Sequence, residues 1–215
     1  MANKLSPFNP LAIYNLVSAG LWAYLLYRVI VVYPKLGQPA FFQDTRATLN
    51  AIQCGALIEI FNSLTGIVRA PLLTTVAQVA SRLLLTVGVF QFLPESYNAH
   101  NFTFLTLLIA WSTTEVVRYS FYYCNLTLSS GAPRILIVLR YNLFWILYPL
   151  GVASELLILY SSLSVAETNY PVAVKWGLIA GMLVYIPGFP MLFSHMVAQR
   201  KKVMKSSKSH EKKQS

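Results

Sequence analysis

The sequence predicts an all-α polytopic membrane protein, a bundle of six transmembrane helices. Apolar residues make up 56% of the 215 residues, and only 11% are Asp, Glu, Lys or Arg. Because a soluble domain averages about 25% charged residues, this composition excludes soluble globular proteins, disordered chains and coiled coils. The apolar residues fall into six segments long enough to cross a bilayer, a distance that takes about 20 helical residues.

The first three segments lie in the N-terminal half of the chain. The first covers residues 11–33, and we expect Pro34 to end it because proline cannot continue the hydrogen bonding of a helix. The second, residues 45–68, is the weakest because it contains four polar residues. These are Asn50, Gln53, Glu59 and Asn62. The third covers residues 71–92, and the proline at its start suits a first helical turn.

The remaining segments cover residues 101–123, 135–162 and 172–197. The connections between segments are short, and the chain shows no internal repeat. We therefore expect a single transmembrane domain over residues 1–199, followed by a basic cytosolic tail over residues 200–215.

The positions of lysine and arginine predict the orientation, since cytosolic loops carry an excess of both. The net charge is +10, and residues 200–215 contain seven basic residues against the single acid Glu211. Lys4, Arg69 and Arg134 share the side of this tail if the spans number six. Both termini are therefore expected in the cytosol. A short basic tail on a hydrophobic body favours a lipid surface, not nucleic acid, as its contact.

The chain ends in Lys212-Lys213-Gln214-Ser215. Lysines third and fourth from the C-terminus form the dilysine pattern of endoplasmic-reticulum retrieval, which is read from the cytosol. The predicted topology places the tail on that side. The alternative is a chance match within a lysine-rich tail.

Several classes of site are missing from the sequence. Neither Cys54 nor Cys124 begins the Cys-x5-Arg loop of a cysteine phosphatase, because Ile60 and Ser130 stand six residues on. The three histidines are scattered, and no zinc spacing or other metal or cofactor motif is present. We therefore expect buried free thiols, no cofactor and no metal.

Ionisable residues within the spans are the first functional signal, because a charge in the membrane is costly and usually faces the bundle interior. This set is Arg28, Glu59, Arg82, Glu115, Arg118, Arg140 and Glu155. Each residue taken singly could belong to an ion pair that fixes helix packing. Taken together, the set predicts a polar cavity lined by several helices and closed to lipid.

Residues 111–123 and 140–155 concentrate this chemistry. Tyr141, Tyr148 and Glu155 are spaced by seven, so they lie within about 20° of one helical stripe, and the last two stand about 10 Å apart along the axis. That gap fits the reacting carbons of a substrate with a proton-transfer group on each side. Pro149 predicts a kink, and Gly151 removes a side chain between the two groups. From the spacing alone, hydrogen bonding of these residues to neighbouring helices is as good an interpretation as catalysis.

The two runs, and above all Tyr-Pro-Leu-Gly-Val-Ala-Ser-Glu at residues 148–155, resemble the very-long-chain (3R)-3-hydroxyacyl-CoA dehydratases. This family is also called protein tyrosine phosphatase-like and, in plants, PASTICCINO 2. The resemblance covers residues 11–199. It implies that Tyr148 and Glu155 are catalytic, in the third step of fatty-acid elongation in the endoplasmic reticulum. It also implies an acyl-CoA substrate and contacts with other elongation enzymes: the condensing enzyme, the ketoacyl-CoA reductase and the enoyl-CoA reductase.

This dehydration needs a base for the C2 proton and an acid for the C3 hydroxyl. We assign Glu155 as the base, since desolvation in a membrane cavity makes a carboxylate a stronger base, and Tyr148 as the acid. The reverse assignment stays open, because a nearby arginine could favour the tyrosinate. Support of the cavity or substrate binding is expected from five further residues. These are Arg82, Glu115, Arg118, Arg140 and Tyr141.

The depth of the site limits how the substrate enters. Measured from a cytosolic helix start near Ile135, Tyr148 lies about 20 Å in and Glu155 about 30 Å in. We expect the nucleotide of coenzyme A to stay at the mouth near Arg69 or Arg134, with the acyl chain in an apolar tunnel. The rival reading is a non-enzymatic scaffold or small transporter, which would tolerate Tyr148→Phe.

Overall fold

The computed structural model describes the backbone of residues 4–214 and the side chains of residues 4–205. Every regular element in that part of the chain is helical, which confirms the all-α prediction. In chain order the elements are α1 (Pro10–Tyr27), η1 (Arg28–Val32), α2 (Tyr33–Leu36), α3 (Ala40–Cys54), α4 (Leu57–Leu64), α5 (Leu72–Leu83), η2 (Leu84–Val89), η3 (Tyr97–His100), α6 (Phe102–Thr127), α7 (Arg134–Asn142), α8 (Phe144–Asn169) and α9 (Val172–Gln214).

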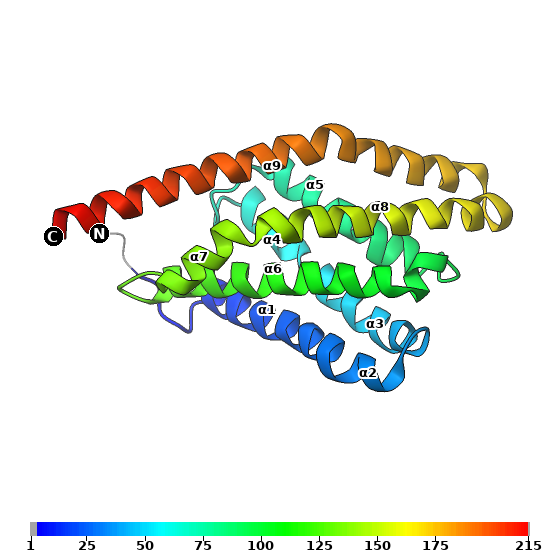
Figure 1. The fold of residues 1–215 in the computed structure, drawn as a ribbon, viewed down its shortest axis with the longest axis horizontal. Helices are drawn as coiled ribbons and strands as arrows, with labels where there is room; N and C mark the ends of the chain where they lie inside the picture. Colours follow the sequence, from blue (N-terminus) through cyan, green and yellow to red (C-terminus); the bar gives the residue numbers. More distant parts are fainter. Residues whose placement is uncertain (1–3, 215) are drawn as a thin grey trace.

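The long helices run side by side along the length of the molecule (Figure 1). Helix α6 lies in the middle, with α1 packed on one side and α8 on another, and α9 packs on α8. This position explains why α6 buries polar as well as apolar side chains. The first described residues and the end of α9 lie at the same end of the bundle (Figure 1).

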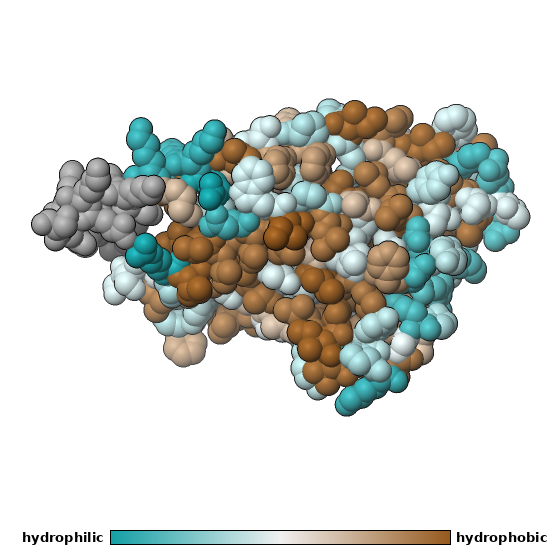
Figure 2. Space-filling model, viewed as in Figure 1, coloured by the Kyte–Doolittle hydropathy of each residue, from teal (hydrophilic) through white to brown (hydrophobic). Residues whose placement is uncertain are grey.

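Four helical stretches are long and apolar enough to cross a membrane: Pro10–Leu36, Leu72–Val89, Phe144–Asn169 and Val172–Lys205. Large apolar side chains on these stretches are exposed, such as Leu73, Ile146 and Ile186 at 83%, 70% and 69%. Figure 2 shows apolar side chains over the flanks of the bundle and polar ones gathered toward its ends. The chain is therefore a polytopic membrane protein. Helix α6, at 26 residues, has the length of a span but a more polar composition.

Pro34 does not end the first span, contrary to the sequence prediction. Helix α1 continues through η1 into α2, which contains Pro34 in its first turn. The π-helical turn of η1 explains this, because Tyr33 donates its N–H to Arg28 O, five residues back. The wider turn leaves room where a proline ring would otherwise meet the carbonyl four residues earlier.

The second and fifth predicted segments are each divided. Residues 45–68 become α3 and α4, separated at Gly55 and Ala56, where Ala56 N–H turns back to Gln53 O at 3.0 Å. Glycine is a weak helix former, and the break separates Glu59 from α3. Residues 135–162 become α7 and α8, separated at Leu143, and α8 extends to Asn169. Tyr141 therefore does not share a continuous helix with Tyr148.

Helix α9 is longer than the predicted sixth span. It runs without interruption past Pro187, Pro190 and Arg200 to Gln214, so the backbone of the basic stretch is helical as far as Gln214. Lysine and arginine are good helix formers, which suits this continuation. The dilysine pair at residues 212–213 and Ser215 lie outside the described side chains.

Two contacts hold α8 and α9 against the rest of the bundle, one between α6 and α8 and one between α9 and η2. Thr106 of α6 and Ser154 of α8 share a hydrogen bond of 2.7 Å between their hydroxyls. Gly181 of α9 lies so close to η2 that an added Cβ would stand 2.6 Å from Leu84 Cδ2. This close approach brings the following turn of α9 toward the bundle interior.

Candidate active site

Most of the ionisable residues within the bundle form one network. The Glu115 carboxylate, 2% exposed, accepts hydrogen bonds from Arg82 and from Arg118 Nε, the latter at 2.6 Å. Arg118 also clamps Glu59: its Nη1 lies 2.9 Å from Oε2 and its Nη2 lies 2.6 Å from Oε1. Two guanidinium groups thus neutralise two carboxylates across α4, α5 and α6.

Two tyrosines close this network on the α1 side. Tyr119 donates its hydroxyl to Glu59 Oε1, and the Tyr14 hydroxyl lies 3.4 Å from the same oxygen. The two hydroxyls are 3.3 Å apart. We call Tyr14, Glu59, Arg82, Glu115, Arg118 and Tyr119 the ion-pair network. Because its charges are paired, it is suited to holding four helices together and not to exchanging protons.

Glu155 has a different environment. Its side chain lies on α8 and the residue is only 8% exposed. Trp111 Nε1 donates to Oε1 at 2.8 Å, and the Tyr185 hydroxyl of α9 donates to Oε2. Within the described part of the chain, no arginine or lysine forms an ion pair with it. Arg82 acts on Glu155 electrostatically without forming an ion pair with it, and the hydrogen bonds to the carboxylate come from neutral groups. Such a carboxylate can gain and lose a proton without breaking an ion pair.

Gly151 lies one helical turn before Glu155 on the same helix. A Cβ at Gly151 would stand 4.0 Å from Glu155 Oε1 and 3.7 Å from Ala110 Cβ. The missing side chain lets Ala110 and Trp111 of α6 pack close to α8 beside the carboxylate. The sequence-based interpretation of Gly151 as a gap between the polar groups stays a prediction.

Tyr148 lies two turns before Glu155 on the same helix. Its ring stacks on Phe189 of α9, with ring centres 5.1 Å apart, and on Phe193 at 6.2 Å. Its side chain is half-buried, and its hydroxyl makes no hydrogen bond to any described residue. A phenol held by its ring with a free hydroxyl is suited to donate a proton to a bound molecule.

The predicted supporting residues divide into two groups. Arg82, Glu115 and Arg118 belong to the ion-pair network, and Arg82 also lies over the Trp111 ring, 5.0 Å from its centre. Trp111 therefore connects the network to Glu155.

The other group lies toward the end of the bundle. Arg140 of α7 donates to the Tyr122 hydroxyl at 2.9 Å and covers the rings of Phe121 and Tyr122. Tyr141 packs its ring edge-on against Phe121. Neither residue contacts Tyr148 or Glu155 among the described interactions. Arg28 pairs instead with Asp44.

Sequence reasoning missed Trp111 and Tyr185 as partners of Glu155. Trp111 begins the segment 111–123 described in the sequence analysis, but its partner Glu155 lies on another helix. Tyr185 is the single tyrosine of residues 172–197. This single phenol hydroxyl within an apolar span was the feature of the sequence that could have identified Tyr185 as a site residue.

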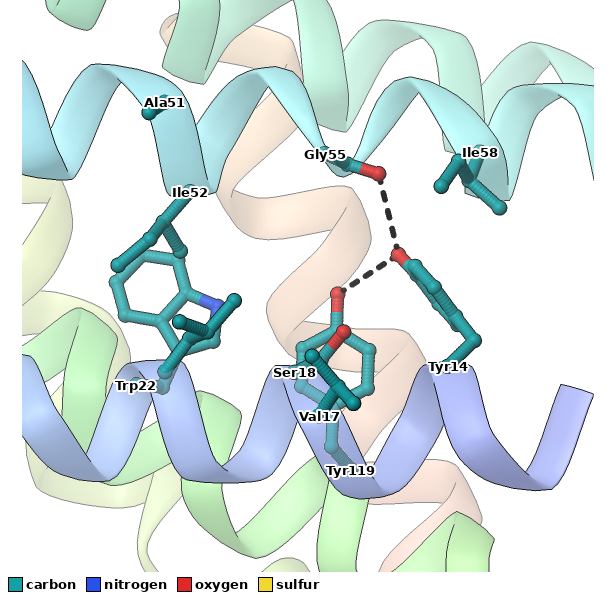
Figure 3. Close-up of a pocket in the computed structure, with 10 residues that line it drawn as sticks. Tyr14, Val17, Ser18, Trp22, Ala51, Ile52, Gly55, Ile58 and Tyr119 are labelled. Atoms are coloured by element: carbon teal, nitrogen blue, oxygen red, sulfur yellow. Dashed lines mark hydrogen bonds between the residues drawn. The ribbon is translucent and has the colours of Figure 1, made fainter. Parts of the chain in front are cut away.

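A separate cavity of about 170 Å³ opens between α1 and the α3–α4 break. Figure 3 shows the Tyr14 hydroxyl linked to Gly55 O and to the Tyr119 hydroxyl, with Trp22 farther along α1 on the same cavity. Neither Tyr148 nor Glu155 lines this cavity. Trp22 packs edge-on against Trp111, with ring centres 6.5 Å apart, so the two indoles connect the cavity wall to the Glu155 site.

Tyr148 and Glu155 place a phenol and a carboxylate on one helix, α8. Within the described residues, no three His, Cys, Asp or Glu side chains gather as a metal site. A carboxylate and a phenol can carry out proton transfer, such as abstraction of a proton beside a carbonyl followed by loss of a protonated leaving group.

Comparison with known proteins adds to this geometry. Residues 53–206 match the family described as "Protein tyrosine phosphatase-like protein, PTPLA". The chain is 37% identical over 206 residues to a probable very-long-chain (3R)-3-hydroxyacyl-CoA dehydratase of Schizosaccharomyces pombe, which covers 94% of this chain and 96% of that protein.

Two further relatives have similar coverage. The very-long-chain (3R)-3-hydroxyacyl-CoA dehydratase hpo-8 of Caenorhabditis elegans is 35% identical over 90% of this chain and 94% of its own length. The dehydratase PASTICCINO 2 of Arabidopsis thaliana is 32% identical over 92% and 94%. No solved structure matches the chain.

Proposed function

Because the chain belongs to the protein tyrosine phosphatase-like (PTPLA) family, we propose that it dehydrates very-long-chain (3R)-3-hydroxyacyl-CoA to the trans-2-enoyl-CoA. The observation that carries this proposal is that the three relatives described above are named as dehydratases, and each aligns over nine-tenths or more of both chains. The word phosphatase in the family name has no chemical counterpart here, since neither cysteine begins a Cys-x5-Arg loop.

In the proposed reaction, Glu155 removes a proton from C2, which lies beside the thioester carbonyl. The electron pair of that C–H bond forms the C2–C3 double bond, and the C3–O bond breaks. Tyr148 gives its proton to the leaving oxygen, so water departs. The neutral donors around Glu155 and the free hydroxyl of Tyr148 support this assignment over the reverse one.

The aromatic rings of α9 suggest where the coenzyme A arm lies. Phe189 and Phe193 continue from Tyr148 along the α8–α9 contact toward Arg200, whose Nε donates to Asn142 Oδ1 at 2.9 Å. We place the thin pantetheine arm against these rings. The nucleotide phosphates then lie at the end of the bundle where α7 begins with Arg134, which keeps one of the two positions expected from the sequence.

The six-span topology with both termini in the cytosol belongs to the same proposal. In it, α6 is a polar span shielded from lipid by α1 and α8, and α3 with α4 forms the remaining pass. The shared location of the first described residues and the end of α9 supports an even number of passes (Figure 1). Reporter fusions before Lys4 and after Ser215 test this topology, and reporters on opposite sides would refute it.

The proposed location is the endoplasmic-reticulum membrane, in contact with the other fatty-acid elongation enzymes. The support is the Lys212-Lys213 pattern together with the proposed cytosolic tail. Replacing both lysines with serine should reduce endoplasmic-reticulum residence and leave turnover unchanged. Unchanged localisation of this variant would mean that the spans or partner enzymes retain the protein.

The activity itself is tested on purified protein in detergent with a (3R)-3-hydroxyacyl-CoA of very long chain length. We expect an enoyl-CoA product that increases linearly with protein concentration. The exposed tyrosine variant Tyr160→Phe serves as a positive control and should be fully active. No product from folded protein would favour the scaffold or transporter alternative.

A further inference from the structure

Helix α9 contributes one polar group to the Glu155 site. The Tyr185 hydroxyl donates to Glu155 Oε2, while Trp111 Nε1 donates to Oε1 at 2.8 Å. The two donors come from helices on different sides of α8, since Trp111 belongs to α6 and Tyr185 to α9. Each carboxylate oxygen therefore has its own donor, and the plane of the carboxylate is fixed from both ends.

The packing of α9 brings Tyr185 to this position. Gly181, one turn earlier on the same face, permits the close approach to Leu84 of η2. The faces of α9 on either side of Tyr185 are exposed, including Val184 and Ile186 at 63% and 69%. The Tyr185 hydroxyl is thus aimed at Glu155 from a helix whose neighbouring side chains point outward.

We propose that Tyr185 is a positioning residue for the dehydration, holding the Glu155 carboxylate in the orientation that reaches the C2 proton of the substrate. This inference rests on the proposed function of Glu155 as the base. Tyr185 does not itself touch the reacting carbons. It acts through Oε2, with Trp111 as its counterpart on Oε1.

The physical reason is rotation about the bond that carries the carboxylate. A single donor on one oxygen leaves the group free to turn, whereas a donor on each oxygen holds its plane. Proton abstraction depends steeply on this alignment, because small displacements of a reacting group cost large factors in rate. Substrate binding should depend on it less, since in the proposed binding mode the coenzyme A arm lies against Phe189 and Phe193.

The experiment compares Tyr185→Phe with the wild type and with Tyr160→Phe, a tyrosine of α8 that is 66% exposed. Phenylalanine keeps the ring and removes the hydroxyl, which donates to Glu155 and also interacts with Ser81. We expect kcat to fall about tenfold or more, the usual effect of losing a hydrogen bond to a charged group. KM should change less than about twofold, since the contacts that bind substrate equally in the ground state and the transition state are unchanged. The thermal midpoint should change little.

The variant Glu155→Gln separates this inference from the function on which it rests. If Tyr185 acts through Glu155, the double variant Tyr185→Phe/Glu155→Gln should be no slower than Glu155→Gln alone. A normal kcat in Tyr185→Phe beside an inactive Glu155→Gln would overturn the positioning role only. An increased KM at constant kcat would also overturn it. An active Glu155→Gln would instead refute the assignment of the base.

Discussion

The bundle contains two buried carboxylates in opposite surroundings. Glu115 is 2% exposed and accepts hydrogen bonds from the guanidinium groups of Arg82 and Arg118. Glu155 is 8% exposed and accepts from an indole and a phenol, both neutral. Burial alone therefore does not distinguish a structural carboxylate from one that can act as a base in a membrane. The charge of the partners separates a carboxylate that holds helices together from one that can exchange a proton.

The reason is electrostatic. A guanidinium stays protonated and stabilises the ionised carboxylate beside it, so protonating that carboxylate would leave a buried cation without a partner. Neutral donors orient a carboxylate without this constraint. We therefore expect substitutions in the ion-pair network to act first on stability, and substitutions around Glu155 to act first on turnover.

The largest effect on turnover outside Glu155 itself is expected from Tyr148→Phe. The ring can still stack on Phe189 and Phe193, so folding should be retained. The loss of the acid should lower kcat about 10²- to 10⁴-fold. Steady-state formation of enoyl-CoA measures it, with thermal unfolding as the control. Turnover within a factor of two of the wild type would remove Tyr148 from the chemistry.

The ion-pair network should respond to Arg118→Ala with a loss of stability. This change leaves Glu59 without its arginine and Glu115 with only Arg82. Removing one partner of a buried pair costs about 3–5 kcal/mol, which should appear as a much lower thermal midpoint in detergent.

The variant Arg118→Lys sharpens this prediction. A single ammonium cannot reproduce the two parallel hydrogen bonds to Glu59, so lysine should recover only part of the stability. Full recovery would show that charge alone suffices. An unchanged midpoint in both variants would contradict a structural role for the network.

A smaller effect is expected from Arg140, which lies over Phe121 and Tyr122 and outside both sites. Exposed cation–π contacts contribute about 0.5–1 kcal/mol. Arg140→Ala should therefore lower the thermal midpoint slightly, and Arg140→Lys less. A loss of kcat as large as that of Tyr148→Phe would move Arg140 into the reaction site.

The sequence predicted the parts of this site that lie along one helix. The seven-residue spacing of Tyr148 and Glu155 is a local property, and both residues do lie on α8. The ion pairs were expected as a class, because charges in a span need partners. The spacing of three between Glu115 and Arg118 suggested that pair, which the structure contains. Partners on different helices could not be named, since Glu59 meets Arg118 only after α3 and α4 separate at Gly55.

The missed features depend on contacts between helices. Trp111 and Tyr185 meet Glu155 from α6 and α9, which no spacing within a single segment can show. The continuation of the first helix through Pro34 depends on the π-helical turn before it. That turn accommodates the ring of Pro34, which would otherwise meet the carbonyl four residues earlier.

The most direct test of the central claim measures kcat and the thermal midpoint of Glu155→Gln and Glu115→Gln side by side. Both changes keep the size of the side chain and remove its charge. We predict that Glu155→Gln keeps a midpoint near that of the wild type and loses nearly all enoyl-CoA formation. Glu115→Gln, which leaves two arginines without their shared carboxylate, should lose stability, while the fraction that remains folded still turns over substrate. Near-normal turnover in Glu155→Gln, or a wild-type midpoint with no turnover in Glu115→Gln, would contradict the account.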